Sequence, residues 1–122
     1  MRILFSVLLL AIGSFVAADH IDVIQVQLRD DCTLDEYLVV VKDFNEWGED
    51  YGYQTEIAVP LQNSDLVTMY WMGRSANAQA FGKAWDAWRD GQGDSSSDPA
   101  KLQARFDECA NPNVARSSFD TY

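Results

Sequence analysis

Six side chains in three stretches of this sequence have the chemistry expected of a small-molecule site. Glutamine, threonine and tyrosine can donate and accept hydrogen bonds, and tyrosine can also exchange a proton. An arginine in a partly dry pocket attracts a carboxylate or an enolate. The six candidates for the pocket are Gln25, Gln27, Thr68, Tyr70, Trp71 and Arg116. The simpler alternative is that they are satisfied polar groups in an interface between two subunits.

Metal sites are poorly supported. Two cysteines are too few for a zinc site built from cysteine alone, and His20 is the only histidine. His20 could help to chelate copper if the mature chain began next to it. Asp90, Asp94 and Asp98 lie in a Gly/Ser loop, but their spacing is not that of an EF-hand calcium site. We therefore expect no metal.

Five aromatic residues offer a further possibility, a hydrophobic ligand box. Most of them recur at helical spacing, which favours ordinary core packing. They are Trp47, Tyr51, Tyr53, Trp85 and Trp88.

The first 18 residues have the pattern of a secretory signal peptide. Arg2 precedes an apolar run that is too short for a membrane-spanning helix, and small residues then lead to Ala18. We expect cleavage after Ala18 and a periplasmic or secreted protein. In such a compartment two cysteines usually pair, so a disulfide between Cys32 and Cys109 is predicted.

The length and net charge of the chain limit its domain number and the kinds of partner it can bind. The chain of 122 residues allows one domain, over residues 19–122, and its 48% hydrophobic content is enough for a core. Lys and Arg number 9 against 19 Asp and Glu, for a formal net charge of −10. This charge repels phosphate backbones and anionic lipid, so we expect no nucleic-acid partner and no membrane association after cleavage.

Periodicity predicts how these residues are positioned. Alternating apolar residues indicate strands, and the T-x-x-E sequence from Thr33 to Glu36 is typical of a capping box at a helix start. Ser75 and Asp98 are the expected N-caps of two later helices. The strands are expected at 20–28, 53–61, 66–72 and 114–122, and the helices at 33–50, 75–90 and 98–110.

The resulting order, β-α-β-β-α-α-β, is the split βαβ pattern of an α+β, ferredoxin-like fold. It places four antiparallel strands in the order 4-1-3-2, with the helices on one face. Strands one and four are then neighbours, which brings Cys32 and Cys109 to the same end of the sheet.

The pattern resembles the dimeric α/β-barrel superfamily, which includes antibiotic-biosynthesis-monooxygenase-like and stress-responsive barrel proteins. The resemblance rests on the element order, on Tyr70-Trp71-Met72 and on Phe81-Gly82-Lys83-Ala84-Trp85. It implies a homodimer whose sheets pack face to face. The haem-degrading members need an asparagine, a tryptophan and a helical histidine. Here only Trp71 matches, Gln25 is the nearest amide, and the second helix lacks histidine, so we expect no cofactor.

We therefore expect an exported, non-catalytic protein that binds a small ligand or serves in a stress response. The alternative is a cofactor-independent monooxygenase or isomerase acting on a small anionic or aromatic compound. Convergence of Tyr70 and Arg116 in one cavity would favour the enzyme, whereas a sheet face filled by a partner would favour a structural role.

Overall fold

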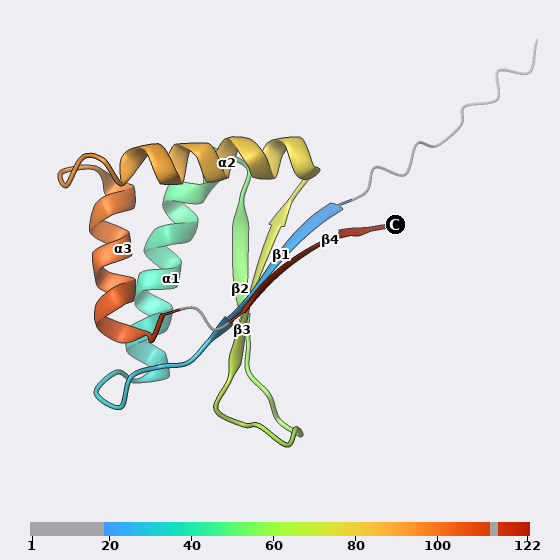
Figure 1. Cartoon of the computed structure of the whole chain (residues 1–122), viewed down its shortest axis with the longest axis vertical. Helices are drawn as coiled ribbons and strands as arrows, with labels where there is room; N and C mark the ends of the chain where they lie inside the picture. Colours follow the sequence, from blue (N-terminus) through green and yellow to red (C-terminus); the bar gives the residue numbers. More distant parts are fainter. Residues whose placement is uncertain (1–18, 113–114) are drawn as a thin grey trace, which may run out of the picture.

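The computed structural model describes residues 19–112 and 115–122, so the expected signal peptide, residues 1–18, lies outside the described part. Three helices cover one face of a four-stranded sheet (Figure 1). The elements are β1 (Asp19–Val26), α1 (Leu34–Glu49), β2 (Gln54–Ala58), β3 (Met69–Ser75), α2 (Ala78–Gly91), α3 (Asp98–Cys109) and β4 (Arg116–Thr121).

The sheet has the order β2-β3-β1-β4, and all neighbouring strands are antiparallel. This is the predicted order 4-1-3-2 read from the other edge, so the ferredoxin-like α+β fold is confirmed. In Figure 1, α1 and α3 run side by side and α2 crosses one end of both, all on the same side of the sheet.

Helix starts follow local hydrogen bonding. The capping box of α1 forms as predicted, because the Thr33 side chain accepts from the Glu36 amide and a Glu36 carboxylate oxygen accepts from the Thr33 amide at 2.8 Å. The other two predicted N-caps were wrong. Ser75 remains in β3 and Asn77 caps α2, while Ser97, one residue before Asp98, caps α3.

The second and third strands also differ from their predicted ranges. The second strand ends at Ala58, before Val59 and Pro60, since proline has no amide hydrogen to donate to a strand ladder. The third strand begins at Met69, three residues later than expected, and continues to Ser75. Asp65 accepts hydrogen bonds from the amides of Val67 and Thr68 at 2.8 and 3.1 Å, so these two residues belong to a turn.

The core lies between the sheet and the helices and contains a cluster of aromatic rings. Phe44 of α1 is at its centre, with ring centroids of Trp71, Trp88 and Tyr53 at 4.8, 5.3 and 5.7 Å. Most of these ring pairs are edge to face, an arrangement that adds to the stabilisation from burial. The core therefore holds α1 and α2 against β3.

The opposite face of the sheet, which we call the open face, carries no helix among the described residues. Alternation along the strands places Val23, Tyr70, Met72 and Phe119 there. Among the described residues, helices cover only the helix-facing side of β3. The adjoining loop between β2 and β3 exposes four more apolar side chains, Val59, Leu61, Leu66 and Val67.

The predicted disulfide between Cys32 and Cys109 is present, with their Cα atoms 5.1 Å apart. It links the turn after β1 to the last residue of α3. The Arg29 amide donates to the Cys109 carbonyl at 2.9 Å beside it, and Leu28 forms an isolated bridge with Ala110. No helix in the described part of the chain is long and apolar enough to cross a membrane.

Candidate functional site

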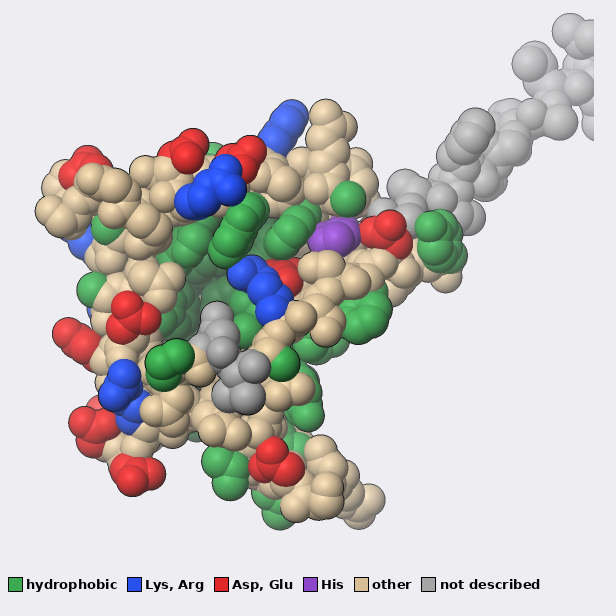
Figure 2. All heavy atoms as spheres, viewed as in Figure 1, with side chains coloured by type: hydrophobic (Ala, Val, Ile, Leu, Met, Phe, Trp, Pro, Cys, Tyr) green, Lys and Arg blue, Asp and Glu red, His purple; other side chains and the backbone are tan. Residues whose placement is uncertain are grey.

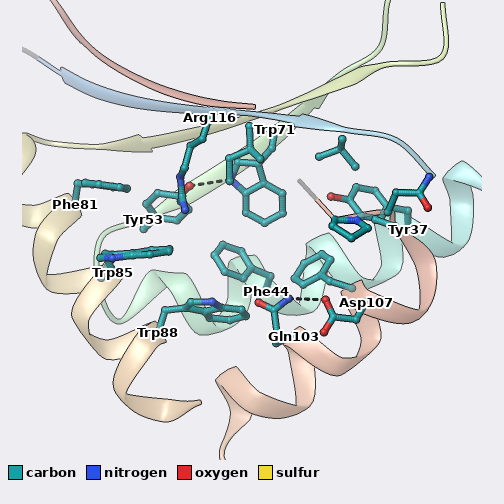
Figure 3. A pocket seen from close by; sticks show the side chains of 17 residues that line it. Tyr37, Phe44, Tyr53, Trp71, Phe81, Trp85, Trp88, Gln103, Asp107 and Arg116 are labelled. Atoms are coloured by element: carbon teal, nitrogen blue, oxygen red, sulfur yellow. Dashed lines mark hydrogen bonds between the residues drawn. The ribbon is translucent and has the colours of Figure 1, made fainter. Parts of the chain in front are cut away.

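A cavity of about 270 Å³ lies between the helix-facing side of the sheet and the three helices. Figure 2 shows hydrophobic side chains gathered in a hollow beneath α2, and Figure 3 shows the cavity from close by. Eight of its 17 lining residues are aromatic. The aromatic lining residues are Tyr37, Phe44, Tyr53, Trp71, Phe81, Trp85, Trp88 and Phe106.

The alternation of side chains along the strands and the helical repeat of α2 bring these lining residues together. Ile24 of β1 and Trp71 of β3 are cross-strand partners on the helix-facing side, and both line the cavity. Phe81, Trp85 and Trp88 recur every three or four residues along α2, so they project from one face of that helix. The sheet thus forms one wall and α2 forms another.

A hydrogen-bond chain crosses the sheet wall. The Trp71 Nε1 atom donates to the Tyr53 hydroxyl at 2.8 Å, and this hydroxyl donates to Asp22 Oδ2 at 3.3 Å. Burial raises the pKa of Tyr53 above its ordinary value. Tyr53 therefore stays neutral near pH 7 and acts as a hydrogen-bonding link.

Asp22 and Arg116 form an ion pair at the end of this chain. The Asp22 side chain, 0% exposed, accepts from Arg116 Nε at 3.1 Å and from Nη2 at 2.7 Å, and Ser118 Oγ donates to it at 3.5 Å. Burial lowers the pKa of Arg116, but the hydrogen bonds and charge of Asp22 more than offset this effect and hold the pKa above its usual value. Arg116 therefore keeps its positive charge near pH 7.

The guanidinium of Arg116 also lies over the ring of Trp85, with its Cζ atom 4.3 Å from the ring centroid. This is a cation–π contact between β4 and α2. Figure 3 shows Arg116 reaching from the sheet toward Tyr53 and Trp85. The arginine is thus oriented by a carboxylate on one side and by an aromatic face on the other.

Polar groups on the far side of the cavity come from α1 and α3. Gln103 Nε2 donates to Asp107 Oδ1 at 2.8 Å, and both residues line the cavity. Tyr37 is 2% exposed, and its hydroxyl makes no hydrogen bond to any other described residue. In Figure 3 this hydroxyl points into the cavity. Burial raises the pKa of Tyr37, so it is a neutral donor near pH 7.

The six residues predicted for a pocket divide between the two faces of the sheet. Trp71 and Arg116 line the cavity. Gln25 and Tyr70 are cross-strand partners on the open face. Gln27 and Thr68 lie just beyond the ends of β1 and β3, where Gln27 Nε2 donates to Thr68 Oγ1 at 3.0 Å.

Arg116 and Tyr70 do not converge in one cavity, because Arg116 and Ser118 lie on the helix-facing side of the sheet. Arg116 is the partner of Ile24 and Ser118 is the partner of Asp22, so both point toward the helices. The carboxylate that Arg116 binds belongs to Asp22 of its own chain. Tyr70 and Arg116 therefore cannot act on one ligand within this chain.

Sequence reasoning missed Asp22, and for the aromatic residues it favoured core packing over a hydrophobic ligand box. Asp22 shares its strand face with Ile24, and a carboxylate at a core-facing position is a signal for a buried ion pair. Tyr53, Trp85 and Trp88 do line the cavity. Trp47 instead packs between Trp88 and Tyr51, with ring centroids at 5.2 and 4.7 Å.

Two of the side chains considered for copper and calcium binding, those of His20 and Asp94, make contacts within the protein. His20 Nδ1 lies 3.0 Å from Asp120 Oδ1, and the His20 ring packs on Phe81 with centroids 4.6 Å apart. Asp94 accepts hydrogen bonds from Ser96 within its own loop. No group of three His, Cys, Asp or Glu side chains placed to hold a metal occurs in residues 19–112 and 115–122.

Comparison with known proteins assigns no function. No protein-family model and no curated protein matches the chain. One similar solved structure is a dimeric protein of unknown function with a ferredoxin-like fold from Bacteroides fragilis, at 14% identity and a TM-score of 0.42, covering 84% of this chain and 94% of that one. Another is the structural-genomics protein YJCS, at 14% identity and a TM-score of 0.46, covering 85% and 99%.

Proposed function

We propose that this chain is a non-catalytic binding protein for a small, planar aromatic molecule. The observation that carries the proposal is the cavity of about 270 Å³, walled by eight aromatic side chains and a few polar groups. Small-molecule sites have this composition, in which apolar rings supply affinity and isolated polar groups set orientation. The volume lies just below the usual range of about 300–1,000 Å³, so the ligand is small.

The chemistry of the polar groups supports binding rather than proton transfer. Burial raises the pKa of both Tyr37 and Tyr53, which makes them poor acids and bases near pH 7. The carboxylate of Asp22 is occupied by Arg116, Tyr53 and Ser118. Tyr70, the proton donor that the monooxygenase or isomerase alternative would use, lies on the other face of the sheet.

The proposed setting is the periplasm or the extracellular space, with residues 19–122 as the mature domain. The Cys32–Cys109 disulfide supports an oxidising compartment. The proposed signal peptide would direct export of the protein to that compartment.

The proposed assembly is a homodimer in which two open faces pack together. Val23, Tyr70, Met72 and Phe119 form an apolar surface there, and Phe119 is 54% exposed. Contiguous apolar surface of this kind usually marks an interface. A two-fold axis would place the same patch on both subunits.

The binding proposal is tested by filling the cavity. Ala84 of α2 is buried and lines the cavity, so Ala84→Phe should place a ring in the ligand's space. Ala87 lies on the same helix and does not line the cavity, which makes Ala87→Phe the matched control. Isothermal titration calorimetry with 2-naphthol should show binding by the wild type and by Ala87→Phe, and none by Ala84→Phe. Equal binding by both variants, or no binding by the wild type, would contradict the proposal.

A further inference from the structure

Charge at the cavity wall is balanced within the protein. Arg116 is the only cationic side chain among the described lining residues, and both of its hydrogen bonds go to the fully buried Asp22. The pair has no net charge. Asp107, on the opposite side, adds one exposed carboxylate to the lining.

The ion pair leaves one edge of the guanidinium unused. Nε and Nη2 donate to Asp22, whereas Nη1 makes no hydrogen bond to a described residue. Because a guanidinium is planar and its donors have a fixed geometry, holding two nitrogens fixes the direction of the third. The Trp85 ring, 4.3 Å from Cζ, restrains the same plane. Arg116 therefore presents an oriented donor without a free positive charge.

Resting on the proposed function, we infer that the cavity selects an uncharged aromatic ligand that carries a carbonyl or hydroxyl oxygen beside Arg116. A carboxylate would lose its hydration and find no unpaired cation in return. The exposed Asp107 and the formal net charge of −10 further oppose an anion. For a cationic ligand, the Trp85 face that could bind it is already covered by the guanidinium of Arg116.

The Tyr37 hydroxyl supplies a second point of orientation. Figure 3 shows Arg116 and Tyr37 on opposite sides of Trp71. Tyr37 is a buried residue, and its hydroxyl points into the cavity. A planar ligand lying along Trp71 would have the Arg116 donor near one end and this hydroxyl near the other. Such a ligand has polar atoms at its two ends and an apolar middle.

The experiment compares ligands that share one ring system and differ in charge. Calorimetric titration of the wild-type protein at pH 7 uses 2-naphthol, 2-naphthoate and 2-naphthylmethylammonium. We expect 2-naphthol to bind at least about tenfold more tightly than either ion. A charged group that is buried without a partner loses its hydrogen bonds to water, and this cost is enough to weaken binding about tenfold. This ranking requires no variant.

The role of Asp22 is tested by Asp22→Asn, which keeps the shape of the side chain and removes its charge. Arg116 then becomes an unpaired cation at the cavity wall, and we expect the affinity for 2-naphthoate to rise about tenfold or more. Asp120→Asn is the matched control, because Asp120 pairs with His20 and does not line the cavity. It removes the same charge from the protein and should leave 2-naphthoate binding unchanged.

A double variant separates the charge of Arg116 from other effects. Asp22→Asn with Arg116→Gln leaves no buried ion without a partner, and it should restore the preference for 2-naphthol over 2-naphthoate. Wild-type protein that binds 2-naphthoate as tightly as 2-naphthol would overturn the inference and leave the binding function standing. An Asp22→Asn variant that folds without gaining affinity for 2-naphthoate would also overturn it. Failure of all three ligands to bind would instead overturn the proposed function.

Discussion

The ring of Tyr53 lies directly against Gly73 of β3, in the space that any larger side chain at position 73 would occupy. Tyr53 immediately precedes β2, and its neighbour Thr55 is the cross-strand partner of Gly73. The close approach brings the Tyr53 hydroxyl within hydrogen-bonding distance of both Trp71 Nε1 and Asp22. The absence of a side chain at Gly73 therefore makes the hydrogen-bonded wall of the cavity possible.

Gly73→Ala is expected to destabilise the protein by about 1–3 kcal/mol, the usual cost of overpacking a core. Its methyl group would displace the Tyr53 ring and break the chain from Trp71 to Asp22. Urea unfolding measures the change. The matched control is Gly82→Ala in α2, where an added Cβ meets no atom within 4 Å. It should stabilise by about 0.5–1 kcal/mol, because alanine is preferred in a helix. Equal stabilities of the two variants would contradict the role assigned to Gly73.

Removal of the disulfide by Cys32→Ser with Cys109→Ser is expected to lower stability by up to about 4.5 kcal/mol, from the chain-entropy cost of a loop of this length. The two cysteines are 77 positions apart. The hydrogen bond from the Arg29 amide to the Cys109 carbonyl should keep the native arrangement of the segment. Chemical denaturation of the double variant and of reduced wild-type protein should give the same loss. A double variant as stable as the oxidised wild type would show that the bridge does not contribute.

The capping box of α1 predicts a pH dependence. Hydrogen bonds from the backbone and then the side chain of Thr33 lower the pKa of Glu36 below its ordinary value of 4.5. A lowered pKa in the folded state means that Glu36 contributes stability above pH 4.5, which is lost as the pH falls through the folded-state pKa. Wild type should therefore exceed Glu36→Gln in stability at pH 7, and the difference should shrink below pH 4.5. Thermal unfolding from about pH 3 to pH 7 measures it, and a pH-independent difference would contradict the role of the charge.

Dimerisation through the open face predicts that Phe119→Glu yields monomers. A carboxylate in the centre of an apolar interface would be buried without a partner, at a large energetic cost. Sedimentation of the wild type should show a dimer. Val39→Glu is a matched control, because Val39 lies on α1 and is 57% exposed, close to the 54% of Phe119. It should remain dimeric. Monomeric wild-type protein at micromolar concentration would contradict the proposed assembly.

Patterns among residues close in sequence predicted most of the secondary structure. Alternation over His20–Leu28 and the Thr33–Glu36 box depend on residues close in sequence, so β1 and the start of α1 were predictable. The β-α-β-β-α-α-β order then led to the strand order and to the Cys32–Cys109 bridge, because chain connectivity allows few arrangements. The two wrong N-caps lie where neighbouring residues compete for the same role, at Ser75 with Asn77 and at Ser97 with Asp98.

The chemistry of the cavity depended on tertiary contacts. Strand β4 reads Arg-Ser-Ser-Phe-Asp-Thr, in which polar residues occupy both alternating sets, so its own pattern does not say which side faces the helices. Pairing with β1 decides this, since a shift of one residue would move every side chain to the other face. The sequence by itself determined the elements, their order and the disulfide. Only the tertiary structure decided that Arg116, which lines an aromatic cavity, pairs with Asp22, 94 positions away. The physical reason is that cross-strand register is set by packing of the whole sheet and not by any one strand.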